Sequence, residues 1–287
     1  MRIAIISGGK NKSKISSESA DNIFLDLQPH ADKVLSIKIN DKGEWSQNGI
    51  KITPHSSLIH VDHILDITHD THNQSTKDFI KKLGVRHVLS EEHNHEFLRG
   101  LARQLGIDFP KYHVIKNKTD IISEVHKKWR EMHMPIYVRG ASNKVLTIDT
   151  HNPEELYRHI LHIHDKNHDV IIDEKVKGKK YSLVSIANFR GQDIYTTPII
   201  EKMTTNRKLF LSAKSLSEDQ KTEINNLAKK IHMTTGGLLL KHDFVMAKNG
   251  PVLVNVETRP AYTKSSSFYD MLSSSGINFM EILKSFK

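Results

Sequence analysis

The sequence predicts a mixed fold, α/β at its N-terminal end and α+β over the remainder, in two or three compact lobes. Strand-like and helix-like segments alternate over residues 1–90, which is typical of a parallel sheet with helices on both faces. Further along, Asn249-Gly250 separates two apolar runs and indicates a β-hairpin. The length of 287 residues is long for one small domain and short for two large ones.

The first 90 residues begin with an apolar run at residues 3–6, which predicts a buried strand that ends at Gly8-Gly9. This glycine pair indicates either a tight turn or an anion site beside a helix N-terminus. Residues 16–27 predict a helix because Ile23, Phe24 and Leu27 fall on one face. The other elements expected in this part are strands over residues 34–39, 49–52, 60–67 and 87–89, and a helix over residues 75–83.

The rest of the chain also predicts helices and strands of ordinary length. Gly106 and Pro110 interrupt one helical pattern. Asn152, Pro153 and two acids give another helix a cap, a first-turn proline and N-terminal negative charge. The expected helices lie near residues 97–101, 121–132, 152–164, 218–231 and 279–283, and the expected strands cover residues 112–115, 135–139, 144–148, 170–172, 181–187 and 194–200. Residues 202–208 form the most loop-like segment.

Composition excludes several classes of protein. No cysteine occurs, which excludes a disulfide framework, a thiolate nucleophile and a zinc–thiolate site. No apolar run is long enough for a transmembrane helix and the first run is too short for a signal peptide, so we expect a cytoplasmic protein without membrane contact. The formal net charge is +9, but the lysines are scattered and no aromatic-rich RNA-binding motif occurs. We interpret the charge as an ordinary basic surface and do not expect a nucleic-acid partner.

The 19 histidines gather in groups within residues 60–63, 69–72, 93–95 and 159–164. Histidine is the commonest metal ligand, yet none of these groups has a zinc spacing such as His-Glu-x-x-His. We interpret them as surface histidines.

Polar residues stand at the outer ends of the predicted hairpin, Asp243 on one arm and Asn255 and Glu257 on the other. Asn255 and Glu257 are two residues apart, so on a strand they point to the same face. Closing the hairpin brings Asp243 near them if the register is suitable. Two carboxylates and an amide oxygen suit Mg²⁺ held together with substrate phosphates. The alternative is a solvated hairpin face with scattered polar residues.

The order of these parts, with Gly106-Ile-Asp-Phe-Pro110 in the middle and Asp243-Phe244 followed by Asn255-Val-Glu-Thr-x-Pro260, resembles the ATP-grasp superfamily and most of all the D-alanine–D-alanine ligases. The resemblance covers nearly the whole chain. It implies the ATP-grasp fold, with a Rossmann-like lobe at residues 1–90, a central lobe at 91–178 and a C-terminal lobe with the metal hairpin at 179–287.

The resemblance also implies an activity. The cofactors would be ATP and Mg²⁺, and the substrates small-molecule amino acids that are joined in peptidoglycan biosynthesis. A substrate carboxylate would be phosphorylated to an acyl phosphate, which an amine then attacks. The oligomeric state is left open, and a homodimer is one possibility.

Residue by residue, the resemblance assigns the metal ligands to Asp243, Asn255 and Glu257, with the amide and acid of the second arm in reversed order. The arginine that steadies the tetrahedral intermediate falls on Lys241, which keeps the charge but loses the planar fork. A phosphate-binding lysine falls on Arg139, which can grip a phosphate with two hydrogen bonds. Lys241 and Arg139 are therefore the expected catalytic residues.

Other assignments depart further from the family pattern. The remaining expected ATP contacts are His95, Asp173, Glu174, Val176 and Lys180, and the expected substrate contacts are His69, Ala261 and Ser266. Lys180 replaces an acid that holds the ribose hydroxyls, and the glycine-rich phosphate lid is absent after Arg139. The glutamate that anchors a substrate amino group is missing after Gly8-Gly9. We expect residues 202–208, with Lys202, Arg207 and Lys208, to supply a mobile lid instead.

These departures leave more than one function open. The chain is expected to be an ATP-dependent carboxylate–amine ligase of the D-alanine–D-alanine type. The missing glutamate favours a ligase that acts on another acid and amine. The missing lid, Lys180 and the reversed metal pair favour a descendant that binds nucleotide without catalysis.

Overall fold

The computed structural model describes residues 1–9, 13–68, 78–80, 82–87, 95–115, 121–129, 136–139, 145–148, 152–163, 170–204 and 208–285. The chain divides into two compact units. Unit 1 consists of Met1–Ile107, Lys179–Phe244 and Asn255–Lys287, and unit 2 of Asp108–Gly178 and Val245–Val254. The division into three lobes at residues 90/91 and 178/179 stays a prediction.

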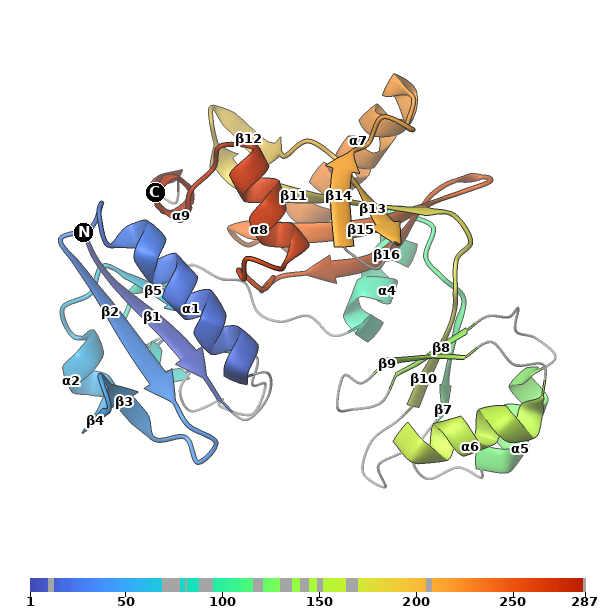
Figure 1. The fold of residues 1–287 in the computed structure, drawn as a ribbon, viewed down its shortest axis with the longest axis horizontal. Helices are drawn as coiled ribbons and strands as arrows, with labels where there is room; N and C mark the ends of the chain where they lie inside the picture. The colour runs from blue at the N-terminus through green and yellow to red at the C-terminus, as the bar shows by residue number, and fades with distance from the viewer. Residues whose placement is uncertain are drawn as a thin grey trace. The chain divides into compact units, whose positions relative to one another are not determined.

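The first sheet of unit 1 has six strands in the order β4-β3-β2-β1-β5-β6 (Figure 1, blue). Its strands are β1 (Arg2–Gly8), β2 (Lys33–Ile39), β3 (Trp45–Gln47), β4 (Ile50–Ile52), β5 (His63–Asp66) and β6 (Arg86–His87). β1 pairs in parallel with β2 and β5, and β5 pairs in parallel with β6, as the alternation of strands and helices predicts. β3 and β4 add an antiparallel ribbon at one edge.

Both faces of this sheet are covered, because the side chains of β1 alternate between two apolar clusters. Ile3 and Ile5 lie in one cluster with Ile23 of α1 (Ser13–Leu27). Ile6 lies in the other cluster with Leu58 of α2 (Pro54–Leu58). The prediction of a parallel sheet covered on both faces is confirmed for this part of the chain.

The glycine pair after β1 forms a close approach between neighbouring strands. Gly8 has φ +94°, and a Cβ atom there would lie 2.2 Å from the carbonyl oxygen of Ile39. The N–H of Gly8 donates to Oγ of Ser16 at 3.0 Å, and the N–H of Gly9 donates to the carbonyl of Ile39 at 2.7 Å. Both amides are thus bonded within the protein, which favours the tight turn over an anion site.

Unit 2 contains a four-stranded antiparallel sheet in the order β7-β10-β8-β9 (Figure 1, green). Its elements are β7 (Tyr112–Ile115), α5 (Ile121–Trp129), β8 (Ile136–Arg139), β9 (Val145–Ile148), α6 (Pro153–Ile163) and β10 (Val170–Glu174). Val125 of α5 and Leu156 and Ile160 of α6 cover apolar residues of the sheet in one buried cluster. These elements follow the ranges that the sequence predicts, within the residues described.

The third sheet, in unit 1 apart from the tip of its last hairpin, has the order β14-β13-β11-β15-β16, and β12 pairs with β11. Its strands are β11 (Lys179–Phe189), β12 (Gln192–Thr196), β13 (Ile200–Thr204), β14 (Lys208–Ser212), β15 (Leu239–Ala247) and β16 (Gly250–Glu257). The β15–β16 hairpin turns at Lys248 and Asn249, so the hairpin prediction is confirmed.

Two expectations for this sheet are wrong. The single strand expected over residues 194–200 is divided into β12 and β13, because Pro198 interrupts the run. Residues 202–208 were expected to form a mobile lid loop, yet Lys202 lies in β13 and Lys208 begins β14. Antiparallel pairing joins these strands, with Thr204 opposite Lys208. Arg207 lies outside the described residues.

Among its described residues, unit 1 also contains the helices α4 (His95–Leu105), α7 (Glu218–Thr235), α8 (Ser267–Ser274) and α9 (Phe279–Ser285). α7 begins with a capping box, in which Oγ of Ser217 accepts from the N–H of Gln220 while the side chain of Gln220 accepts from the N–H of Ser217. Of the helix expected over residues 75–83, residues 78–80 and 82 are described and helical, and Leu83 lies in the turn that follows. Within the described ranges, no helix combines the length and the hydropathy needed to cross a membrane.

Candidate active site

Four polar side chains meet at the end of the β15–β16 hairpin that is farthest from its turn. Nζ of Lys241 lies 2.9 Å from Oδ2 of Asp243 and 3.0 Å from Oε1 of Glu257. Nδ2 of Asn255 donates to the same two oxygens, at 3.4 Å and 3.2 Å. The structure therefore brings together Lys241 and the three residues predicted as metal ligands. We call these four residues the hairpin cluster.

The strand geometry explains why the cluster forms. Lys241 and Asp243 are two residues apart on β15, and Asn255 and Glu257 are two residues apart on β16, so each pair points to one face of its strand. Adjacent pairing of β15 and β16 then places the two pairs side by side.

Ser182 is a further member of the site that the sequence analysis missed. It lies on β11, next to β15, and its Oγ donates to Oδ1 of Asp243 at 2.6 Å. Both carboxylate oxygens of Asp243 thus accept hydrogen bonds from the protein. The available signal was a serine at the fourth position of the strand that begins at Lys179, but the partner of Ser182 depends on the order of the strands.

The charges of the cluster stabilise one another. Burial lowers the pKa of Lys241, but the attraction of Asp243 and Glu257 outweighs burial, and the net pKa is raised above the ordinary lysine value. Burial raises the pKa of Asp243, but the charge of Lys241 and the hydrogen bond from Ser182 outweigh it, so the pKa is lowered. One ammonium therefore faces two carboxylates, and the cluster keeps one net negative charge.

The donor set fits one divalent cation. Carboxylate and amide oxygens are the ligands that Mg²⁺ prefers, and Mg²⁺ usually takes one or two carboxylates together with phosphates and water. Asn255 turns its NH₂ group towards the two acids, and a half-turn of the amide would present Oδ1 instead. Among the residues described, no group of three His, Cys, Asp or Glu side chains is placed to hold a metal ion.

The expected ATP contacts lie on several elements. Arg139 is the last residue of β8, opposite Ile171, and Asp173 and Glu174 end β10, all in unit 2. Val176 follows β10 and is half-buried. In unit 1, His95 is the first residue of α4, and Lys180 on β11 lies opposite Lys202 on β13. Their contacts with ATP stay predictions.

The expected substrate contacts have different outcomes. Ser266 caps the N-terminus of α8, because its Oγ accepts from the N–H of Tyr269 at 3.1 Å. This bond uses an acceptor site and leaves the hydroxyl hydrogen to be donated. Ala261 lies in the segment between β16 and α8. His69 lies outside the described residues, and its neighbour Thr68 is buried.

A second polar network, also missed from sequence, surrounds Arg259 in the segment after β16. Nη1 of Arg259 donates to the carbonyl of Thr68 at 2.6 Å and lies 3.3 Å from Oδ2 of Asp66. Oδ1 of Asp66 accepts from the N–H and the hydroxyl of Thr68, at 3.0 Å and 2.6 Å. The segment that precedes the predicted substrate residue His69 is therefore bonded to the segment that follows the hairpin cluster.

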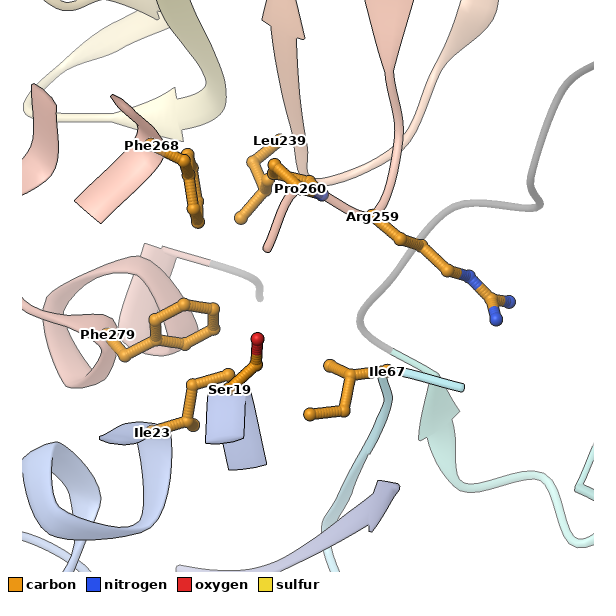
Figure 2. Close-up of a pocket in the computed structure, with 8 residues that line it drawn as sticks. All are labelled: Ser19, Ile23, Ile67, Leu239, Arg259, Pro260, Phe268 and Phe279. Carbon is orange, nitrogen blue, oxygen red and sulfur yellow. The ribbon is translucent and has the colours of Figure 1, made fainter. Parts of the chain in front are cut away.

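A small cavity lies beside this network (Figure 2). Its lining residues are Ser19, Ile23, Ile67, Leu239, Arg259, Pro260, Phe268 and Phe279. Figure 2 shows the guanidinium group of Arg259 directed away from the apolar lining residues. The volume of about 10 Å³ is room for one water molecule at most, so this cavity is a packing gap and not a substrate site.

Three successive sheets, the last ending in a hairpin that carries carboxylates and a fixed cation, are the arrangement of the ATP-grasp class of proteins. Residues 101–286 match the family model described as "D-ala D-ala ligase C-terminus". The chain therefore belongs to the D-alanine–D-alanine ligase family.

Known relatives extend the similarity over the whole chain. The D-alanine–D-alanine ligase of Mycobacterium avium is 21% identical, over 99% of this chain and 94% of the relative. The structure of D-alanyl-alanine synthetase A from Vibrio cholerae has a TM-score of 0.81 and 16% identity, over 99% and 96% of the two chains. That of the Bacillus anthracis D-alanine–D-alanine ligase, complexed with ATP, has a TM-score of 0.75 and 17% identity, over 99% and 95%.

Proposed function

We propose that this ligase uses ATP and Mg²⁺ to join two amino acids, with D-alanine as the first candidate, through an acyl phosphate. The observation that carries the proposal is the hairpin cluster, in which two carboxylates and an amide surround a fixed ammonium group in a chain of this family. The ATP complex of the Bacillus anthracis relative supports ATP, and the names of the relatives support amino acid substrates.

In the proposed reaction, the carboxylate of one amino acid takes the γ-phosphoryl group of ATP, and ADP is released. The amine of the second amino acid attacks the acyl carbon, phosphate leaves, and the amine loses a proton as the new amide bond forms. Neither step needs a nucleophile from the protein, so a chain without cysteine can carry out both. Catalysis then depends on positioning and on fixed charge.

The residues of this chain supply that charge. Asp243, Asn255 and Glu257 are proposed to hold Mg²⁺, which when bound would offset the charge of the phosphates. Lys241 is proposed to offset negative charge on the reacting carboxyl group, because two acids hold its ammonium in place. Arg139 is proposed to grip a phosphate with its planar guanidinium group.

The remaining contacts follow the same assignment. His95, Asp173, Glu174, Val176 and Lys180 are proposed to contact ATP. His69, Ala261 and Ser266 are proposed to contact the amino acids, with Ser266 donating its hydroxyl hydrogen to a substrate carboxylate. The match to the Mycobacterium avium ligase spans 354 aligned positions, more than the 287 residues here, so the relative has segments that this chain lacks. The absence of a glycine-rich phosphate lid after Arg139, which the sequence predicts, is in keeping with such gaps.

The test is phosphate release from ATP and Mg²⁺ in the presence of D-alanine or a panel of other amino acids. We expect amino-acid-dependent release and a dipeptide product, both lost in Asp243→Asn. Asp193→Asn is the matched control, since Asp193 is an exposed acid on β12 of the same sheet. Folded protein that releases no phosphate with any amino acid would contradict the proposal.

A further inference from the structure

The ammonium group of Lys241 occupies the position between the two acids of the hairpin cluster. It bonds to Oδ2 of Asp243 and Oε1 of Glu257, the two oxygens that face each other. Its side chain is 8% exposed, so little water shares this position. A positive charge is therefore already built into the place where a cation would bridge the acids.

We propose that Lys241 takes the place of one divalent cation, so that this ligase binds a single Mg²⁺ with its nucleotide. The inference rests on the proposed function, because it concerns the metal content of the same site.

The first argument is the supply of ligand oxygens. Oδ1 of Asp243 accepts one bond, from Ser182, whereas Oδ2 of Asp243 and Oε1 of Glu257 each accept from both Lys241 and Asn255. Within the described part of the chain, the cluster oxygens that accept no hydrogen bond are Oε2 of Glu257 and Oδ1 of Asn255. Oδ1 of Asp243 accepts one bond only and keeps a lone pair, so it can bind the same ion as these two oxygens. Phosphate oxygens and water would complete the shell of one Mg²⁺.

The second argument is charge. Two carboxylates and one ammonium leave a net charge of −1, and one divalent ion already exceeds it before the phosphates are counted. Two divalent ions about 4 Å apart repel each other strongly and need negative ligands between them. Asn255, the amide that contacts both acids, is neutral and offers no such charge.

The third argument is burial. A divalent ion that bound Oδ2 of Asp243 would have to displace the ammonium group of Lys241. The displaced charge would then be buried without a carboxylate partner, which is strongly unfavourable. The ammonium group therefore stays in place when the metal binds.

The experiment counts bound metal directly. The full chain is saturated with a non-hydrolysable ATP analogue and Mn²⁺, dialysed to equilibrium, and the protein-bound Mn²⁺ and nucleotide are measured. One Mn²⁺ per bound nucleotide is the expected ratio. Two Mn²⁺ per nucleotide would overturn the single-cation inference and leave the proposed function standing. Absence of bound nucleotide would overturn the proposed function as well.

Variants at Lys241 test its part in this ratio. Lys241→Met removes the charge and leaves Oδ2 of Asp243 and Oε1 of Glu257 bonded to the neutral amide of Asn255 alone, so the ratio should rise from one to two. Lys241→Arg keeps the charge and should keep the ratio at one, which also covers the case in which the Met variant fails to fold. Lys214→Met, at an exposed lysine between β14 and α7, is the control and should change nothing. A ratio that stays at one in folded Lys241→Met, with unchanged Mn²⁺ affinity, would contradict the inference.

Discussion

Arg259 and Asp66 form a buried ion pair, with Nη1 of the arginine 3.3 Å from Oδ2 of the acid and side-chain exposures of 3% and 4%. The pair joins the end of β5 to the segment after β16, elements that lie far apart in the sequence. It connects the first sheet to the segment that follows the hairpin cluster.

Removing one partner of this pair should be costly. Asp66→Asn removes a buried carboxylate that pairs with Arg259 and accepts two bonds from Thr68, and we expect a loss of about 3–5 kcal/mol in the free energy of unfolding. Urea denaturation measures the loss. Glu44→Gln, in the exposed pair with Lys51, is the control and should change stability little. If both variants lost only a little of the free energy of unfolding, the buried pair would not stabilise the contact between the two segments.

Ser182 should affect activity through Asp243. Ser182→Ala removes a hydrogen bond of 2.6 Å to a carboxylate that is proposed to act at the metal site. A bond to a charged group contributes about 1.5–3 kcal/mol, so we expect a loss of kcat/KM of roughly 10–100-fold. Steady-state phosphate release measures it. Ser46→Ala, on β3 of the first sheet, is the control and should keep full activity.

His232 should make stability depend on pH. Its Nδ1 lies 2.6 Å from Oγ of Ser185, and its Nε2 lies 3.1 Å from the carbonyl of Gly237. Burial lowers the pKa of His232, and the hydrogen bond to Gly237 only partly opposes this effect. Below the ordinary histidine pKa of about 6.5, the unfolded chain binds a proton that the folded chain resists. The stabilising contribution is therefore complete above that pH and is lost as pH falls below it.

The measurement is urea denaturation at pH 7.5 and at pH 5. We expect the wild-type midpoint to fall at pH 5, and His232→Gln to show a smaller fall. His30→Gln, at an exposed histidine, should behave as the wild type. An equal fall in His232→Gln and in the wild type would assign the pH dependence to other groups.

Gly178 should tolerate no side chain. It has φ +149°, and a Cβ atom there would lie 2.0 Å from the carbonyl oxygen of Met246. Gly178→Ala must move one of the two backbones, and we expect a loss of about 1–3 kcal/mol, typical of overpacking and backbone strain. Thermal denaturation checks this, and an unchanged melting temperature would refute the close approach.

Gly100 should give the opposite result. It lies inside α4, and a Cβ atom there would meet nothing within 4 Å. Gly100→Ala should stabilise the protein by roughly 0.5–1 kcal/mol, because alanine loses less backbone entropy in a helix. The same thermal measurement compares the two glycine variants directly, and a loss of stability in Gly100→Ala would contradict the helix assignment.

The fold was predictable where the local pattern and the tertiary structure agree. Short apolar runs predict the strands that end at Gly8 and at Ile115, and the turn dipeptide Asn249-Gly250 predicts the hairpin. In each case neighbouring residues alone carry the signal. α8 was missed because its serine-rich sequence is typical of a loop, and only the burial of Phe268, Met271 and Leu272 against the core makes it helical.

The site was predictable only in part, for a related reason. Spacing on the strands brings Asp243, Asn255 and Glu257 together, and this could be derived from the hairpin alone. The position of Lys241 between the acids, and the bonds from Ser182 and Arg259, depend on which strands become neighbours. No periodicity in the sequence encodes that order.

The first strand and the last described helix of unit 1 share one core, and this has a consequence for biosynthesis. Ile3 and Ile5 of β1 pack in the same cluster as Phe279, Ile282 and Leu283 of α9. A ribosome makes the chain N-terminus first, so β1 and α1 emerge long before α9 joins their cluster. During that interval the part of the cluster that α9 later covers is exposed, and chaperones can recognise such apolar surface. Contacts so distant along the chain also slow folding once synthesis is complete.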